Sequence, residues 1–348
     1  MKQKNKNSGL VLPFQGIRAI AIFAILIYHC GNPEMYQLAT WSVSVFFILS
    51  GFLIGRKGPD ENVVGNISIK TCGLYMWKHI KKLYPLHLIM LLISIPVSGM
   101  IEDIEMNGIE KLPFWVIVFG MNVTLTKSWY PNYYFGFNGV AWFLSTYAVL
   151  CFLSPVLFVR FKELRKKLKG SFTFVSISAL IILCFCYCLV IGHSTLNIEY
   201  WTYIFPFARI FEYCIGMIAG MTGVRIERNS VSVFQIASVI CVFVLIFYMD
   251  MPQWLYRSAV WIVPNLILIL SVYQNEGILA RCFSMKPLVY VGNLSGYIFL
   301  IHQVCYSYFT QYGFVSASLE NRIVIAIAVL LISLVLANVY QKVFVLKR

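Results

Sequence analysis

The feature that most constrains this chain is a series of apolar segments, each long enough to cross a hydrocarbon core of about 30 Å. A backbone in lipid must satisfy its own hydrogen bonds, and within a single segment only a helix does so. The sequence therefore predicts an all-α, polytopic integral membrane protein with about ten transmembrane helices. The segments lie at 12–31, 39–55, 83–101, 139–159, 172–192, 201–223, 231–249, 257–273, 287–309 and 323–346.

The composition excludes an aqueous globular fold. Of the 348 residues, 59% are hydrophobic and 12% are charged, about half the charged share of a soluble domain. The net charge of +14 would suggest nucleic-acid binding in a soluble protein. Here the basic residues lie in short loops between apolar segments, where they set topology and contact lipid headgroups. We therefore expect the lipid bilayer, and no nucleic acid, as a partner.

The distribution of basic residues predicts the orientation. Lysines near the N-terminus favour a cytoplasmic start. The basic block at 160–169 then also falls inside, provided that the shorter apolar run at 112–125 does not cross. We expect a re-entrant or interfacial segment at 112–138 and both termini in the cytoplasm, in the inner (plasma) membrane of the cell. Residues 1–348 are predicted to form a single membrane-embedded domain with no soluble appended domain.

The ten cysteines do not suggest a metal site or a disulfide framework. Cys184, Cys186 and Cys188 follow one another at a spacing that points successive side chains to different faces of a helix. We expect free thiols that behave as small hydrophobic groups, and no metal.

Arg18 and His29 lie within the first apolar segment, where polar side chains are costly and usually functional. Eleven residues separate them, so eleven steps of about 100° turn both side chains in nearly the same direction, about 16 Å apart along the axis. One interpretation is that Arg18 reaches lipid headgroups and His29 is interfacial. The other is a polar stripe that lines a cavity, with a cation near the inner end and a proton acceptor near the outer end.

Other polar residues also fall within apolar segments. Arg209 and Glu212 are three residues apart, which fits either an intrahelical ion pair or a site. The small residues at 216–220 predict a helix-packing face. His302 lies in the middle of a segment, as a hydrogen-bonded structural residue or as part of a site.

A basic cluster precedes the third segment in YMWKHIKKLYPLH, residues 75–87. It contains Lys78, His79, Lys81 and Lys82. These side chains either set topology and touch acidic lipid or bind a phosphorylated ligand.

Six motifs in order resemble the membrane-bound acyltransferase family 3. The first helix has the family's Arg, ten residues, His pattern in Arg18 and His29, and the second has FFILSGFLIG at 46–55, which contains Ser50. The others are KHIKKLYP, AWFL at 141–144 with Trp142 and a later Pro155, ARIFEYCIGMIAG at 208–220, and GNLSGYIFLIHQ at 292–303. The resemblance covers most of the chain.

The resemblance implies an acyltransferase that moves an acyl group, usually acetyl, from a cytoplasmic acyl-CoA to a hydroxyl of a cell-surface or lipid-linked carbohydrate. The acceptor would be of the capsule, exopolysaccharide or O-antigen type. His29 would be the base, and Arg18 would position the donor or stabilise negative charge. No cofactor would be tightly bound, because acetyl-CoA is the donor substrate.

The resemblance also assigns the remaining candidates. Lys78, His79, Lys81 and Lys82 would hold the CoA phosphates, with His79 and Lys82 at the positions of the family's Arg-x-x-Arg. Tyr147 stands where many members have a glutamate, so the sequence identifies no acidic partner for His29. The other site candidates are Ser50, Trp142, Arg209, Glu212 and His302.

A transporter or flippase of a lipid-linked or anionic sugar is the alternative. Arg18, Arg209 and His302 would then bind the substrate at mid-membrane. The sequence shows no inverted repeat, which favours the acyltransferase.

Overall fold

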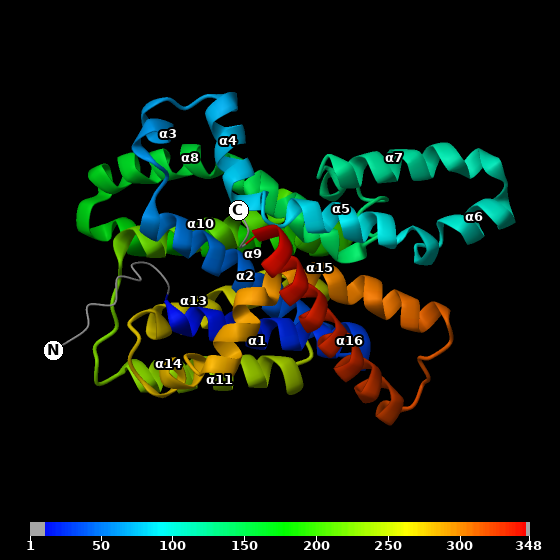
Figure 1. Ribbon diagram of the computed structural model, residues 1–348. Helices are drawn as coiled ribbons and strands as arrows, with labels where there is room; N and C mark the ends of the chain where they lie inside the picture. The colour runs from blue at the N-terminus through cyan, green and yellow to red at the C-terminus, as the bar shows by residue number, and fades with distance from the viewer. Residues whose placement is uncertain (1–10, 346–348) are drawn as a thin grey trace.

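The structure is a computed structural model that describes residues 11–345, and every regular element in that range is a helix (Figure 1). The α-helices include α1 (Leu12–Leu26), α2 (Tyr36–Lys57), α5 (Tyr84–Ile93), α8 (Trp142–Leu168), α9 (Phe172–Gly192), α10 (Ile210–Thr222), α11 (Val231–Phe247), α13 (Ile262–Tyr273), α15 (Lys286–Gln311) and α16 (Leu319–Tyr340). The remaining α-helices of this range are α3 (Glu61–Gly65), α4 (Ile69–Ile80), α6 (Met100–Asn107), α7 (Leu112–Val123), α12 (Gln253–Tyr256) and α14 (Ile278–Phe283). The all-α prediction is confirmed.

Five segments among the described residues are long and apolar enough to cross a membrane. They are Leu12–Gly31, Tyr36–Lys57, Gly139–Gly192, Lys286–Gln311 and Leu319–Val345. The third contains both α8 and α9, with a turn at Lys169, where φ is +48°. The chain is therefore a multi-pass membrane protein, but the expected count of about ten spans is not confirmed.

The remaining expected spans are short or interrupted, and proline explains two of the interruptions. In 83–101, α5 ends at Ile93, and a separate turn (Ile95–Val97) containing Pro96 follows. In 201–223, Pro206 has no N–H to donate and forces Phe205 to be extended, so α10 begins only at Ile210.

Helix α7 covers most of the apolar run at 112–125, and its 12 residues pack against α5. The Tyr84 hydroxyl donates to the carbonyl of Val123 over 2.8 Å, and the His87 ring lies 2.9 Å from the carbonyl oxygen of Asn122. Twelve helical residues rise about 18 Å, less than the hydrocarbon core. The segment therefore forms a short helical arm joined to α5.

The centre of the fold depends on glycines that let helices approach closely. A Cβ on Gly51 of α2 would overlap the carbonyl oxygen of Tyr213, and one on Gly216 of α10 would overlap that of Ile48. The packing face predicted at 216–220 is thus confirmed, with α2 as its partner. On α15, a Cβ on Gly292 would overlap the carbonyl oxygen of Gln15, so α15 lies equally close to α1.

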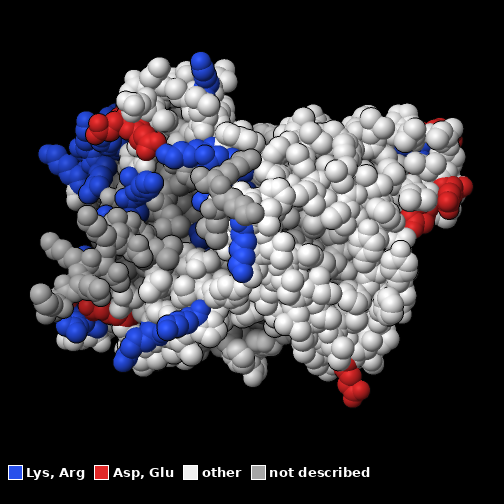
Figure 2. Space-filling view, in the orientation of Figure 1, with Lys and Arg blue, Asp and Glu red and all other residues white. Residues whose placement is uncertain are grey.

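The charges divide the molecule into two ends. Figure 2 shows most Lys and Arg side chains, with a few acidic ones among them, at the end of the molecule near α3 and α8, and a group of acidic side chains at the opposite end, where Figure 1 places α6. We call these the basic end, with Arg56, Lys57 and Lys78, and the acidic end, with Glu102 and Asp103. Membrane proteins usually keep their basic loops on the cytoplasmic side.

Candidate active site

Arg18 and His29 both face α8 and α15 rather than lipid. Arg18 lines two cavities at the basic end together with Tyr147 of α8. His29 lines one cavity at the acidic end together with Trp142 of α8 and Gln303 of α15. The helical spacing therefore predicted the shared direction of the two side chains correctly.

The acidic-end cavity combines aromatic walls with hydrogen-bonding groups in about 370 Å³. His29 enters it from a π-helical turn (Ile27–Gly31) that continues α1. Such widened turns are rare in helices and frequently occur at functional sites. The cavity is lined by Tyr28, His29, Val97, Ser98, Phe135, Phe137, Gly139, Val140, Trp142, Glu199, Tyr203, Gln303 and Ser307.

Two histidines lie next to each other here, of which His29 lines the cavity and His302 does not. The ring centroids of His29 and His302 are 5.4 Å apart, and His302 is fully buried. The Nδ1 atom of His302 lies 2.8 Å from the carbonyl oxygen of Phe299. Two residues that are 273 positions apart in the sequence thus form one cluster, through the packing of α1 against α15.

A carboxylate that the sequence analysis did not single out also lines the acidic-end cavity. Glu199 accepts a hydrogen bond from Nη1 of Arg257 over 2.8 Å. It has helical backbone geometry directly before the π-helical turn at Tyr200–Ile204, and no spacing or motif in the sequence connects it with His29. Only the fold brings the two into one cavity.

The basic-end cavities collect a different set of groups. Arg18, Ser50, His79 and Tyr147 line both of them, and their volumes are about 180 and 280 Å³. Lys57 adds a cation to the smaller cavity, and Lys82 adds one to the larger. Lys57 was not among the predicted site residues.

The structure divides the predicted basic cluster in two. His79 and Lys82 line the cavities beside Arg18, whereas Lys81 lines neither. Lys78 instead forms an exposed ion pair with Asp60, 2.7 Å long. The two residues at the positions of the family's paired arginines are therefore the two that face Arg18.

His79 is held by its own helix. Its Nδ1 atom donates to the carbonyl oxygen of Tyr75 over 2.8 Å, and the two rings contact each other at a tilt of 42° with centroids 4.4 Å apart. Burial, assisted by the ammonium groups of Lys78 and Lys57, lowers the pKa of His79 below its ordinary value. The ring is therefore neutral at pH 7, and the positive charge at these cavities comes from Arg18, Lys57 and Lys82.

Three phenylalanines separate the two sets of cavities, and we call them the aromatic partition: Phe46 of α2, Phe143 of α8 and Phe299 of α15. The ring centroids of Phe143 and Phe299 are 5.2 Å apart, and those of Phe46 and Phe143 are 6.1 Å apart. All three line a small void of about 50 Å³. Arg18 and His29 therefore line separate cavities in the structure, and not the single cavity that was expected along a polar stripe.

Arg209 and Glu212 form a fully buried ion pair, 2.9 Å long, and neither lines a cavity described above. The other two guanidinium nitrogens also have partners: Nε donates to the carbonyl of Tyr203 and Nη2 to that of Arg257, both over 2.8 Å. The guanidinium lies 4.5 Å from the ring centroid of Tyr203, which lines the acidic-end cavity. The pair therefore supports the wall of that cavity.

The remaining two candidates lie at different ends. Ser50 lines both basic-end cavities. Trp142 lines the acidic-end cavity, with its ring centroid 4.9 Å from that of Tyr203.

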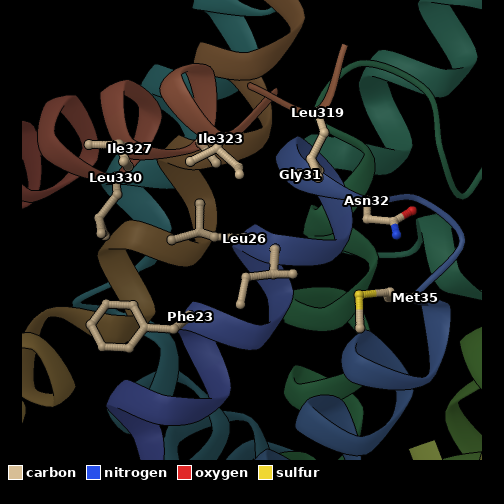
Figure 3. A pocket seen from close by; sticks show the side chains of 11 residues that line it. Phe23, Leu26, Gly31, Asn32, Met35, Leu319, Ile323, Ile327 and Leu330 are labelled. Carbon is tan, nitrogen blue, oxygen red and sulfur yellow. The ribbon is translucent and has the colours of Figure 1, made fainter. Parts of the chain in front are cut away.

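An apolar groove lies beside the π-helical turn and is bounded by α16 (Figure 3). Its volume is about 350 Å³, and Asn32 is the one amide side chain in its lining. Ile27 and Gly31 of the turn line it, close in the chain to His29. The groove offers room for a hydrocarbon chain but no group for acid–base chemistry.

Comparison with known proteins gives one family. The family model described as "Acyltransferase domain" matches residues 14–340. A protein of Staphylococcus aureus strain COL named "Putative O-acetyltransferase" is 24% identical over 335 residues, which are 89% of this chain and 53% of that protein. A protein with the same description from strain MSSA476 is 24% identical over 85% of this chain and 51% of its own length. The chain thus spans about half the length of these curated relatives, and no solved structure matches it.

Proposed function

This chain belongs to the acyltransferase-domain family, and from that premise we propose that it transfers an acyl group, most simply acetyl, from acyl-CoA to a hydroxyl of a cell-surface or lipid-linked carbohydrate. The main support is that one helix presents a half-buried cation, Arg18, to cavities at the basic end and an imidazole to a cavity at the acidic end. We also propose that the basic end faces the cytoplasm, with the protein in the inner (plasma) membrane.

The basic-end cavities suit the donor. CoA carries several phosphate groups, and Lys57 and Lys82 offer ammonium groups to bind them. Arg18 lines the same cavities and lies about 16 Å from His29 along the helix axis. At that distance Arg18 cannot touch a thioester carbonyl that lies next to His29. We therefore assign Arg18 to positioning the donor, and not to stabilising negative charge on that carbonyl.

The acidic-end cavity suits a sugar. Sugar rings have apolar faces and hydroxyl edges, so they bind between aromatic rings and polar groups. Tyr28 and Trp142 supply rings, and Glu199, Gln303 and Ser307 supply carboxylate, amide and hydroxyl groups. Ligand sites typically combine apolar walls with a few placed polar groups in this way.

In the proposed reaction His29 is the general base. It takes the proton of the acceptor hydroxyl as the oxygen attacks the thioester carbonyl. The new C–O bond forms, the C–S bond breaks, and the CoA thiolate leaves and is protonated by the imidazolium. The acyl arm must pass the aromatic partition to reach His29, so the rings of Phe46, Phe143 and Phe299 must move apart during turnover.

The experiment supplies purified protein with acetyl-CoA labelled with ¹⁴C in the acetyl group and a panel of hexose and N-acetylhexosamine oligosaccharides. We expect label in glycan with the wild type and a loss of at least about 100-fold in His29→Ala, the usual scale for a general base. His193→Ala is the matched control, because His193 is exposed and lines none of the cavities described here. Transfer that persists in His29→Ala would overturn the proposed role of His29.

The transporter remains the second candidate, because cavities at opposite ends with a partition between them also fit alternating access. Movement of a lipid-linked sugar across vesicles without any acetylation would establish it in place of the acyltransferase.

A further inference from the structure

The tautomer of His302 follows from its hydrogen bond. Its Nδ1 atom lies 2.8 Å from the carbonyl oxygen of Phe299 and 3.3 Å from that of Ile298. A carbonyl oxygen only accepts hydrogen bonds, so Nδ1 must carry the hydrogen. In the neutral ring, Nε2 then has a free lone pair and is an acceptor.

That acceptor has no partner. The Nε2 atom of His302 is buried and forms no hydrogen bond within residues 11–345. Buried polar atoms are nearly always paired, so an unpaired one marks a place where a functional partner is to be sought. The ring of His29 is 5.4 Å away, centroid to centroid, on the adjoining helix.

We propose that His302 is a positioning residue for His29: its Nε2 atom accepts a hydrogen bond from one ring N–H of His29. The second nitrogen of His29 is thereby directed, with its lone pair, toward the acceptor hydroxyl in the acidic-end cavity. This inference rests on the proposed acyl transfer. It gives His29 the orienting partner that catalytic bases commonly have, supplied by a second histidine instead of a carboxylate.

The proton transfers of the proposed reaction are the same with His302 in this role. His29 gains the hydroxyl proton as the C–O bond forms and gives it to the thiolate after the C–S bond breaks. Throughout, His302 keeps its own hydrogen on Nδ1 and only accepts a hydrogen bond on Nε2. It stabilises the His29 imidazolium and exchanges no proton with the substrate.

Glu199 does not take this role in the structure. It lines the same cavity, but its carboxylate is engaged by Arg257 at 2.8 Å, and no hydrogen bond joins it to His29. His302 is the residue whose ring contacts that of His29 and has a free acceptor.

A purely structural role for His302 makes the opposite prediction for two substitutions. In His302→Asn, the amide N–H₂ group near the former Nδ1 keeps the bond to Phe299, but nothing replaces Nε2. In His302→Gln, the amide oxygen replaces the acceptor at Nε2, and the bond to Phe299 is lost. If His302 positions His29, Gln keeps more activity than Asn; if it only binds the backbone, Asn keeps more.

The first test measures kcat and KM for acetyl transfer by the two variants, with the glycan and labelled acetyl-CoA of the assay above. We expect His302→Asn to lose about 10- to 100-fold in kcat, the usual cost of removing a group that orients a functional histidine. His302→Gln should retain at least several times more kcat than Asn, and KM for acetyl-CoA should be unchanged in both. Equal losses, or more activity in Asn than in Gln, would overturn the inference.

The second test needs no acceptor. The chain has five histidines, so ¹⁵N-histidine NMR in detergent resolves a small set of ring signals, and His29→Ala assigns those of His29. We expect one dominant His29 tautomer in the wild type and in His302→Gln, and a mixture in His302→Asn. A transferase whose His29 signals are the same in all three overturns the positioning role alone. A wild type that acetylates no glycan overturns the proposed function, and with it the role of His302 in acetyl transfer.

Discussion

At the scale of single residues, stability should depend strongly on the ion pair of Arg209 and Glu212, because both side chains are fully buried. Removing one partner of such a pair leaves an uncompensated charge and costs about 3–5 kcal/mol. The chain also has an exposed pair at the same spacing, Arg160 and Glu163, which should contribute at most about 1 kcal/mol.

We therefore predict that Arg209→Met strongly lowers the melting temperature of the detergent-solubilised protein and that Arg160→Met barely changes it. The double variant Arg209→Met, Glu212→Met should recover part of the loss, because it leaves no lone charge. Melting followed by the monodisperse fraction on size-exclusion chromatography measures all three. Equal effects of Arg209→Met and Arg160→Met would contradict the structural role assigned here.

Lys127 presents a second case of a buried charge. It is fully buried, outside the candidate spans, and its Nζ donates to the carbonyls of Gly136 and Asn138 over 3.0 and 2.9 Å. Burial lowers the pKa of Lys127 to about 7 from an ordinary value of 10.5. Between these values the unfolded chain binds a proton that the folded protein does not, so stability rises with pH in this window.

The prediction is that the wild type gains melting temperature relative to Lys127→Met as pH rises from 7 to 9. The comparison between the two proteins cancels the titration of other groups. Lys111→Met is the matched control, because Lys111 is exposed in the same segment and should leave the slope unchanged. A Lys127→Met slope equal to that of the wild type would mean that the lysine stays charged when folded.

At the scale of helices, the contact between α2 and α10 depends on glycine. We predict that Gly216→Ala sharply reduces folded protein, because the added Cβ would overlap the backbone of Ile48 and push the helices apart. Gly120→Ala in α7 has nothing within 4 Å of its new Cβ and should be neutral or slightly stabilising. The yield of monodisperse protein from equal amounts of membrane compares the two. Similar yields would show that α2 and α10 separate without cost.

The helices also show what the sequence could and could not predict. The length of the apolar segments in the sequence correctly located α1, α2, α15 and α16. The rotation of about 100° per helical residue predicted that the side chains of Arg18 and His29 point in the same direction. Apolar length failed at 201–223, where Pro206 interrupts a segment whose average composition still resembles a span. Hydropathy is averaged over many residues, so a single proline hardly changes it. The same proline can end a helix, because it has no N–H to donate.

Contacts between helices that are distant in the chain could not be predicted from the sequence, for a different reason. Glu199 and the three rings of the aromatic partition come from separate segments, and no local pattern records which helices pack together. His302 was recognisable as a candidate, because a histidine within an apolar segment is unusual. Its place beside His29 was visible only in the packing of α1 against α15.

At the scale of the whole molecule, the charges and the cavities are arranged along the same direction. Figure 2 shows the basic side chains gathered at one end of the molecule. The cavities with Arg18, Lys57 and Lys82 lie at that basic end, and the cavity with His29 lies at the acidic end. Donor and acceptor in the proposed reaction would thus approach from opposite sides of the membrane. In that reaction we expect the aromatic partition to keep the thioester from water until an acceptor is bound.

This arrangement predicts that Phe143→Ala raises the hydrolysis of acetyl-CoA in the absence of glycan, by several-fold over the wild type. Phe143 contacts both Phe46 and Phe299, so removing its ring joins the void between them to the basic-end cavity and lets water and thioester meet near His29. Release of free CoA thiol, measured with a thiol reagent, reports the rate. Phe174→Ala is the control, because that ring is 78% exposed on α9 and lines neither the void nor the basic-end cavity.

The double variant Phe143→Ala, His29→Ala decides where the extra hydrolysis occurs. If water is activated at His29, the second substitution returns hydrolysis to the wild-type rate, whereas a leak at the basic end would be insensitive to it. Unchanged hydrolysis in a well-folded Phe143→Ala would show that the rings do not block the path of the acyl arm. The thioester would then have to reach His29 by a route that avoids the space between α2, α8 and α15, and the two ends of the molecule would not be linked through that space.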